Sequence, residues 1–327
     1  MKASHRIAAI INPVAGGGRA IAGWRNLREI ARRNGDIDEY ISEYPGHATE
    51  VARIVGGDHY SMAFAVGGDG TIHEVVNGLM AHYAGDGYAG PVFGTIPLGR
   101  GNDFARTFGL TTNPAGAWLA QSEVSGVKRK IDVGWVKPVH GAQTHFINMC
   151  GVGFDADAAA SANEVPRILG GSLPYVLGVL ARFSTLKGCD LEIRLKGTQP
   201  VEGVTQPTWA PESFPGGNIS VTDRFLSISV GVGRYLAGGM MLLPKANPVD
   251  GLLDIMMVRS VGRLRVLSML PTVFRGGHIG EPEVAYYRAS HVTIVGDRDL
   301  NIHADGDVIG SGGAEFGVMP SILPVNF

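Results

Sequence analysis

The sequence predicts two domains, an α/β domain built on a mainly parallel sheet and, after it, an antiparallel β-sandwich. Strands alternate with helices from Arg6 to about Asp132, which is the rhythm of βαβ units. After Asp132 the strands are shorter and are separated by turn residues, as in an antiparallel sandwich or meander. A chain of 327 residues is comfortable for two domains and can bury a sizeable core.

The first part carries four expected strands and three expected helices. We expect the strands at 7–11, 37–42, 61–66 and 92–96 and the helices at 21–34, 48–55 and 72–83. Polar or glycine-rich loops follow three of the strands directly, at 12–13, 67–71 and 97–103. Ligands of parallel sheets bind at the carboxyl ends of the strands, so the sequence predicts that these loops converge on one crevice.

The loop at 67–71 is the most informative segment, and it consists of Gly67, Gly68, Asp69, Gly70 and Thr71. Thr71 and Glu74 stand three residues apart, which predicts a capping box at the N-terminus of the following helix. Unpaired N–H groups and the positive end of the helix dipole favour a phosphate there. The Asp69 carboxylate can reach a metal or accept a proton. The alternative is a tight strand-to-helix turn capped by Asp69.

Two further loops combine glycine with a cation. The segment 12–19 reads NPVAGGGR, and its triple glycine before a helix suits a nucleotide phosphate, although the spacing is not that of a Walker A motif. The segment 97–103 reads PLGRGND, in which Arg100 could clamp a phosphate with its guanidinium fork. A glycine loop with a solvated arginine is the alternative for the second segment.

The second part carries six expected strands and two expected helices. We expect the strands at 146–150, 191–195, 226–232, 253–258, 291–295 and 300–303 and the helices at 173–186 and 264–274. The segment 197–218 is rich in Pro, Gly and Thr and lacks periodicity, which predicts an exposed loop. The segment 169–183 is apolar almost all round; it could line a lipid pocket or belong to the core.

Two acidic motifs of the second part could carry chemistry. The segment 246–254, ANPVDGLLD, offers hard oxygen donors that could hold magnesium or calcium, although an Asp-Gly turn explains it as easily. Asp305 and Asp307 flank Gly306 at the end of an expected strand. Such a pair can hold one carboxylate as a base and the other on a cation, but the pattern is also that of a hairpin turn.

Composition limits the class of protein. A formal net charge of −2 argues against a nucleic-acid binder, which usually carries a basic stripe. Two cysteines are no disulfide framework, so a reducing cytoplasm is the expected location. No segment approaches the roughly 20 apolar residues of a membrane span, so we expect any membrane contact to be peripheral.

The motifs taken in order resemble one family. NPxxGGG, GGDGT, PLGxGNDFAR, KRKIDVG, GGMMLLPKANPVDGLLD and a late DGD are similar to the bacterial-type diacylglycerol kinases, soluble lipid kinases related to sphingosine and ceramide kinases. The resemblance runs from Ile7 to about Val325. It implies a Rossmann-like nucleotide domain of the kind found in NAD kinases and phosphofructokinases, a C-terminal β-sandwich for the lipid, and last strands that return to the first domain.

The resemblance also implies roles for particular residues. The residues expected on ATP are Asn12, Pro13, Gly16, Gly17, Ser42, Gly67, Gly68, Asp69, Gly70, Thr71, Glu74, Arg100 and Asn102. Asp69, Asp103 and Asp132 match acidic residues that organise magnesium and water near the transferred phosphate. Asn247, Asp250 and Leu252 match a metal site, two of them through carbonyl oxygens. Asp305 and Asp307 match a DGE motif that supplies the catalytic base, with Asp69 as a further candidate for that role.

The sequence departs from the family pattern at three places. Arg100 stands where the family has Thr, and Asp307 stands where it has Glu, which is longer by one methylene. Val232 and Gly233 replace the usual Asn-Gly before a glycine run. These differences affect the identity of the base and of the lipid more than the class of reaction.

The resulting prediction is an ATP- and Mg²⁺-dependent lipid kinase that acts on a hydroxyl of a lipid such as diacylglycerol. The predicted nucleotide domain covers 1–133 and is rejoined by 315–327, and the lipid domain covers 134–314. An NAD kinase-like enzyme and a non-catalytic nucleotide- or lipid-binding protein are the alternatives. We expect a cytoplasmic protein that meets its lipid at a membrane surface and binds no nucleic acid. The sequence leaves open whether the protein forms a homodimer.

Overall fold

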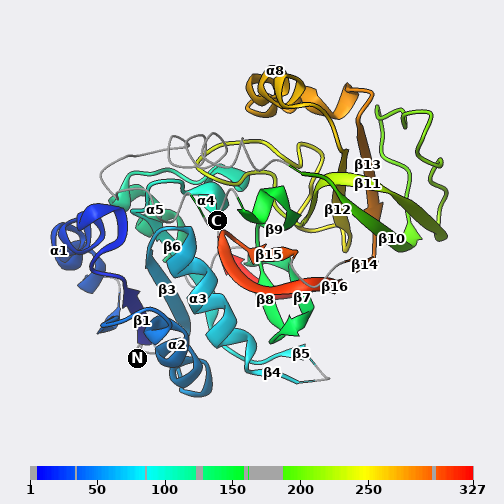
Figure 1. Cartoon of the computed structure of the whole chain (residues 1–327). Helices are drawn as coiled ribbons and strands as arrows, with labels where there is room; N and C mark the ends of the chain where they lie inside the picture. The colour runs from blue at the N-terminus through cyan, green and yellow to red at the C-terminus, as the bar shows by residue number, and fades with distance from the viewer. Residues whose placement is uncertain are drawn as a thin grey trace. The chain divides into compact units, whose positions relative to one another are not determined.

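The chain forms two compact units in the computed structural model, which describes residues 6–33, 35–84, 87–122, 128–157, 161, 187–296 and 300–326. Unit 1 is Met1–Ile131 together with Ser321–Phe327, and unit 2 is Asp132–Pro320. Residues 315–320, which the sequence analysis placed with the returning strands, group with unit 2. Figure 1 shows the elements of both units along the chain.

Unit 1 is a parallel sheet covered by helices. Its strands are β1 (Arg6–Ile11), β2 (Asp36–Ile41), β3 (Met62–Gly67) and β6 (Val92–Pro97), with the short hairpin β4 (Tyr83–Ala84) and β5 (Gly87–Tyr88) outside the sheet. Its helices are η1 (Ala15–Gly17), α1 (Arg19–Arg32), α2 (His47–Gly57), α3 (Asp69–Met80), α4 (Asp103–Thr107) and α5 (Pro114–Gln121). The strand order is β2-β1-β3-β6, and all the pairings are parallel.

The central strands of unit 1 are buried on both faces. β3 and β6 are buried along their whole length, as continuous apolar runs in a covered parallel sheet should be. Trp24 of α1 and Trp118 of α5 pack edge to face with ring centroids 6.1 Å apart, and Trp118 also lies against Phe64 of β3. α2 packs closely on α3, because a Cβ on Gly78 would lie 2.6 Å from Cβ of Ala52. The predicted α/β domain is therefore confirmed.

Unit 2 is built from antiparallel strands. They are β7 (Lys128–Gly141), β8 (Thr144–Phe146), β9 (Met149–Gly153), β10 (Cys189–Thr198), β11 (Gly217–Gly231), β12 (Leu253–Arg259), β13 (Val284–Ala289), β14 (His291–Val295), β15 (Asn301–Ala304) and β16 (Asp307–Asn326). The order β13-β12-β11-β10-β14-β16 forms one run, and β9 joins the second half of β11 to β15. Helix α8 (Arg263–Val273) and the 3-10 helix η3 (Gly277–Gly280) lie between β12 and β13 in the chain.

The structure confirms several predicted elements of unit 2 and corrects others. The strand at 291–295 and the helix at 264–274 correspond to β14 and α8. The segment 197–218 is not simply exposed, since Val201 and Ala210 are buried and Tyr287 donates a hydrogen bond to the Pro211 carbonyl. The strands β7 and β13 were not predicted, and only the last part of β16, at 315–327, was predicted from the family resemblance. The helix predicted at 173–186 and the whole apolar segment 169–183 lie outside the described residues.

β16 belongs to both units. Its first half pairs with β14 and β15 in unit 2, and Val325 near its end pairs in parallel with Phe93 of β6 in unit 1. Asn326 donates to the carbonyl of Gln121, whose side chain in turn bonds both backbone groups of Thr95. The last residues of the chain are thus part of the unit 1 sheet.

Candidate active site

The three predicted loops of unit 1 meet at the carboxyl ends of β1, β3 and β6. Leu98 N–H donates to the Gly67 carbonyl at 2.7 Å, and Asn12 N–H donates to the Val66 carbonyl at 3.1 Å. A Cβ on Gly99 would lie only 2.3 Å from the Cα of Gly68. The second and third loops therefore touch backbone to backbone, which requires glycine at this contact.

Arg19 fastens the first loop to the third. Its Nε donates to the Gly16 carbonyl at 2.9 Å and its Nη2 to the Gly99 carbonyl at 3.1 Å. Gly16 has φ +61°, and a Cβ there would lie 2.3 Å from the Leu98 carbonyl oxygen. Arg19 was recognised in the sequence as a cation after the triple glycine, but it was not among the predicted site residues.

Helix α3 begins at Asp69, and the predicted capping box is absent. Gly68 is the N-cap residue, and as a glycine it has no side chain that could cap the first turn. Glu74 instead accepts from Ala48 N–H at 3.1 Å, at the start of α2, because α2 and α3 pack side by side. The N–H groups of a first turn without a side-chain cap favour an anion. Glu74 therefore lies away from the loop with which it was predicted to act.

Two carboxylates of unit 1 lie at the start of the short helix α4. Oδ1 of Asp69 accepts a hydrogen bond from Phe104 N–H at 3.0 Å, which ties the GGDGT loop to α4. Asp103 is buried, and its Oδ1 lies 3.7 Å from Nε of Arg106. Asn102 has φ +54°, and its Oδ1 accepts from Gly99 N–H at 3.0 Å. The structure thus brings the predicted residues Asp69, Asn102 and Asp103 together.

The other predicted residues of unit 1 lie on the same loops or on the next strand end. Oδ1 of Asn12 accepts from Val14 N–H at 3.2 Å. Ser42 is buried directly after β2, and its N–H donates to the Ile11 carbonyl at 2.8 Å. Arg100 is half-buried between Gly99 and Gly101.

The DGD motif of unit 2 is a two-residue turn whose first carboxylate is an anchor. Asp305 and Gly306 have φ +49° and +100°, as a tight hairpin between β15 and β16 demands. The Asp305 carboxylate accepts backbone N–H bonds from Ile147 at 3.1 Å, Asn148 at 2.9 Å and Met149 at 3.1 Å. Asp307, which opens β16, is exposed. The two carboxylates therefore have different environments.

A buried polar cluster that the sequence analysis missed lies behind this turn. Gly306 N–H donates to Nδ1 of His303, which leaves the imidazole proton on Nε2. That Nε2 lies 3.7 Å from Oδ2 of Asp155, which also accepts from the Ser229 hydroxyl at 3.0 Å. Gly151 makes room for the pair, since a Cβ there would lie 2.3 Å from Nε2 of His303. No sequence motif joins Asp155, Ser229 and His303, so only the fold reveals the cluster.

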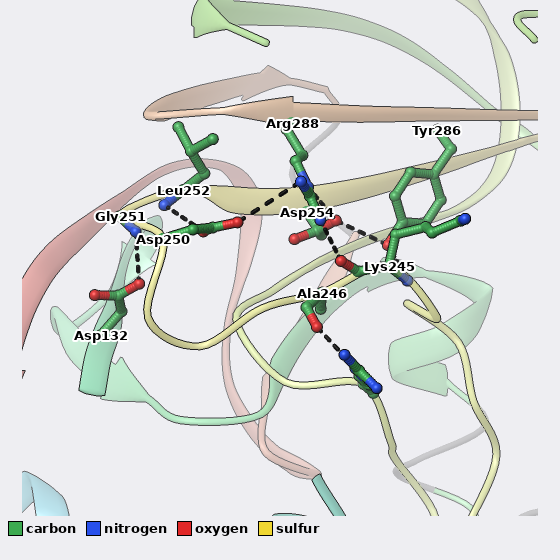
Figure 2. A network of polar contacts seen from close by, with 10 residues as sticks. Asp132, Lys245, Ala246, Asp250, Gly251, Leu252, Asp254, Tyr286 and Arg288 are labelled. Atoms are coloured by element: carbon green, nitrogen blue, oxygen red, sulfur yellow. Dashed lines mark hydrogen bonds and ion pairs between the residues drawn. The ribbon is translucent and has the colours of Figure 1, made fainter. Parts of the chain in front are cut away.

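The predicted metal-site residues of unit 2 gather around one loop, as Figure 2 shows for all but Asn247. Oδ2 of Asp132 accepts from Gly251 N–H at 2.7 Å. Oδ1 of Asp250 accepts from Leu252 N–H at 3.1 Å, and Asp250 N–H donates to the Asn247 carbonyl at 3.4 Å. Asp103, which the resemblance groups with Asp69 and Asp132, belongs to unit 1.

Asp250 and Asp254 both lie beside the guanidinium of Arg288 (Figure 2). Nε of Arg288 lies 3.2 Å from Oδ1 of Asp254, and its Nη1 lies 3.7 Å from Oδ2 of Asp250. Burial raises the pKa of Asp254 to about 6 and also raises the pKa of Asp250, while Arg288 opposes both shifts. Asp254 closes the segment 246–254 that was predicted to offer oxygen donors, whereas Arg288 was not predicted to belong here.

The residues around Asp250 fit a hard divalent cation. Oδ2 of Asp254 is buried and has no hydrogen-bond partner, and the loop adds the Asp250 carboxylate and backbone carbonyl groups. Within the described residues, no three His, Cys, Asp or Glu side chains are placed to hold a metal. A metal at this loop would therefore depend on backbone carbonyls, as the resemblance implies for Asn247 and Leu252.

Unit 2 also contains an apolar cavity of about 100 Å³. Side chains of α8 and of strands β11 and β12 line it, among them Met256, Met269, Leu270 and Val273, together with Met240 from the segment between β11 and β12. Its polar lining consists of Asp155, Ser227, Ser229 and His278. Nε2 of His278 lies 2.9 Å from the Leu242 carbonyl oxygen, and burial lowers the pKa of this imidazole. The Asp155 cluster behind the DGD turn is therefore also part of the cavity wall.

Fold and site together define a class of protein: an α/β domain with glycine-lined loops at its strand ends, joined to a β-sandwich that holds an apolar cavity. The chain belongs to the diacylglycerol kinase family of lipid kinases. The pattern of the diacylglycerol kinase catalytic domain matches residues 6–136, and that of the YegS C-terminal NAD kinase beta sandwich-like domain matches residues 148–327. The predicted family and fold class are thereby confirmed.

Individual relatives agree with this assignment. A diacylglycerol kinase of Mycobacterium tuberculosis is 31% identical over 98% of this chain and 94% of its own length. A diacylglycerol kinase of Bacillus subtilis is 28% identical over 89% of this chain and 85% of its own. A crystal structure of a diacylglycerol kinase from Bacillus anthracis shares the fold, with a TM-score of 0.69 at 19% identity, over 100% of this chain and 98% of the other.

Proposed function

We propose that this protein transfers the γ-phosphate of ATP to the hydroxyl of a lipid such as diacylglycerol. The observation that carries the proposal is the meeting of three glycine-lined loops beside the uncapped first turn of α3. Backbone N–H groups that are brought together in this way suit the phosphates of a nucleotide. Membership of the lipid kinase family supports the same reaction.

In this proposal the loops of unit 1 bind and orient the nucleotide. Arg19 and Asn102 hold the loops in place, and Arg100 adds a positive charge where the family has a hydroxyl. Phosphoryl transfer depends mainly on positioning and on neutralising charge, which is what rigid loops and fixed N–H groups supply. Asp69 is the carboxylate of the second loop, and its hydrogen bond from Phe104 N–H ties that loop to the start of α4.

We propose that Asp307 is the base that accepts the proton of the lipid hydroxyl. Both oxygens of Asp305 already accept backbone N–H bonds, so Asp305 positions the turn, and Asp307 is the exposed carboxylate of the pair. Magnesium would be held by Asp250 with the carbonyls of Asn247 and Leu252, and when bound it would neutralise negative charge. Asp132 orients that loop through Gly251.

The apolar cavity of unit 2 supports a lipid as the acceptor. Valine, leucine and methionine side chains make up most of its wall, and methionine adapts to irregular apolar ligands. An acyl chain fits this lining, and the four polar side chains could meet the glycerol or ester part of the lipid. The segment first considered as the lipid wall, 169–183, plays no part in this argument because its residues lie outside those described.

The experiment is a transfer assay with radiolabelled ATP and the purified protein. Separate reactions contain diacylglycerol, a total lipid extract, NAD or no acceptor. We expect label in the lipid phase only; label in NADP would establish an NAD kinase, and nucleotide binding without transfer would establish a binding protein. Either of these results would refute the proposal.

The matching variant is Asp69→Ala, with Asp58→Ala, an exposed carboxylate of unit 1, as its control. We expect Asp69→Ala to stay folded and to lose activity on the order of 10³-fold, the scale of one electrostatic contact in catalysis. The control should keep wild-type activity. Asp69→Ala activity within about tenfold of wild type would remove Asp69 from the site.

A further inference from the structure

Helix α8 exposes an apolar and cationic surface that the proposed chemistry does not use. Leu264 is 82% exposed, the highest value among the large apolar side chains described, and Phe274, just after the helix, is 36% exposed. Residues 260–280 contain no Asp or Glu but three arginines. In Figure 1, α8 lies above the ends of β12 and β13 in unit 2.

The two sides of α8 have different surroundings. Val266, Met269, Leu270 and Val273 point inward and line the apolar cavity. At 100° per residue, Leu264, Ser268 and Pro271 fall on the opposite side, and Arg275 continues that side beyond the last turn. Ser268, Pro271 and Arg275 are all exposed. One helix therefore separates an apolar cavity from an apolar outer surface.

We propose that the exposed surface of α8 and of the two residues after it docks on a bilayer that contains anionic lipids. This surface consists of Arg263, Leu264, Leu267, Pro271, Phe274 and Arg275, of which all but the half-buried Leu267 are exposed. The proposal rests on the lipid kinase function, because a lipid that enters the cavity has to leave a membrane first. Leu264 and Phe274 insert among the acyl chains, and the arginines meet the headgroups. A shallow helix of this kind binds weakly and reversibly.

Charge favours a membrane over a second copy of the chain. A symmetric contact between two copies would bring the same arginines face to face. Anionic headgroups instead attract them, by about 1 kcal/mol for each basic residue near the surface. Arg265 is not part of this surface, because Glu281 and Glu283 bind its guanidinium.

The test is co-sedimentation of the full chain with vesicles of phosphatidylcholine, with and without phosphatidylglycerol. The apolar variant is Leu264→Gln with Phe274→Gln, and its control is Ile54→Gln with Val139→Gln, which removes two exposed apolar side chains elsewhere. The charge variant is Arg263→Gln with Arg275→Gln, and its control is Arg25→Gln with Arg53→Gln, two exposed arginines of unit 1.

We expect wild type to bind the anionic vesicles and both α8 variants to lose binding. Each apolar replacement should weaken binding roughly tenfold, from the transfer free energy of a large apolar side chain. Each arginine replacement should weaken binding roughly fivefold on anionic vesicles only. The controls should bind like wild type. Thermal melts check that the variants are folded. If the apolar variant does not fold, the charge variant still tests the proposal.

Kinase activity on a short-chain diacylglycerol in detergent separates this inference from the proposed function. Loss of vesicle binding with normal activity in detergent supports docking through α8. Wild-type vesicle binding by both variants overturns it and leaves the kinase proposal intact. If wild type phosphorylates no lipid but binding still depends on α8, docking stands and the kinase proposal fails. A dimer that the apolar variant dissociates, with vesicle binding unchanged, would make this surface a subunit interface.

Discussion

Single residues decide how the candidate site residues are held within each unit. Gly68 and Gly99 allow two loops of unit 1 to touch, and no larger residue fits between them. In unit 2, Asp305 and Asp307 come from one short motif but do different things. Asp305 accepts three backbone N–H bonds, whereas Asp307 is exposed at the start of β16.

Gly99→Ala tests the contact between the loops. The added methyl would lie 2.3 Å from the Cα of Gly68, so the loops have to separate. We expect a loss of about 1–3 kcal/mol in the free energy of unfolding, typical of overpacking, together with a higher KM for ATP. Gly70→Ala is the matched control, because nothing lies within 4 Å of its Cβ position. Equal stability of the two variants would show that the loops do not require glycine at 99.

Asparagine replacements separate the roles of Asp305 and Asp307. Asp305→Asn places an amide against backbone donors, so we expect it to cost about 2–4 kcal/mol of stability in urea melts. Asp307→Asn should change stability by less than about 0.5 kcal/mol, as is usual for an exposed position.

At Asp307 we expect the replacement to change activity strongly although it changes stability little. Asp307→Asn should lower kcat on the order of 10²-fold or more and flatten the acidic limb of the pH–rate profile, because the base is gone. Asp307→Glu should be tolerated, since the family has Glu at this position. Normal rates for Asp307→Asn would place the base elsewhere, with Asp69 as the first candidate.

At the scale of elements, α8 and η3 close the cavity of unit 2. His278 of η3 is only 2% exposed, and burial lowers the pKa of its imidazole below the ordinary value of 6.5. The unfolded chain therefore binds a proton at His278 at a higher pH than the folded chain does. Stability from this residue is complete above about pH 6.5 and is lost as the pH falls toward the folded pKa.

His278→Gln should remove this pH dependence. We expect urea melts between about pH 7.5 and pH 5.5 to show wild type losing at most about 1.4 kcal/mol per pH unit relative to the variant. His59→Gln, at an exposed position, is the control and should follow wild type. Parallel stability curves for wild type and His278→Gln would contradict the burial effect.

At the scale of the whole molecule, β16 is the strand that both units share. Val308, near its start, is 47% exposed, whereas Val325, near its end, is fully buried beside Phe93. Unit 1 therefore completes its sheet with residues that follow all of unit 2 in the chain. Its stability should depend on them.

Val325→Ser tests that dependence against the same change at Val308. Val325→Ser leaves a cavity and buries a hydroxyl, so we expect a loss of about 2–4 kcal/mol and a lower Tm. Val308→Ser should stay within about 0.5 kcal/mol of wild type. A Val325→Ser melt that matches wild type would mean that unit 1 is stable without its last strand.

The sequence alone determined the fold class, the three glycine-containing loops at the strand ends and the family, because local periodicity and short motifs encode them. The alternation of strands and helices before Asp132 specified the parallel sheet. The GGDGT segment specified a glycine turn at a helix N-terminus. The strand β7 escaped prediction because charged residues, glycines and a proline interrupt its apolar pattern.

Only the tertiary structure decided what each polar side chain does. Asp305 bonds the N–H of Ile147, which lies 158 residues away in the chain, and Arg19 reaches the Gly99 carbonyl across 80 residues. Glu74 does not form the predicted cap, because α2 packs on α3 and Glu74 accepts a hydrogen bond from Ala48 N–H of α2 instead. Hydrogen bonds and burial depend on which segments the fold brings together, and no local pattern in the sequence records those distances.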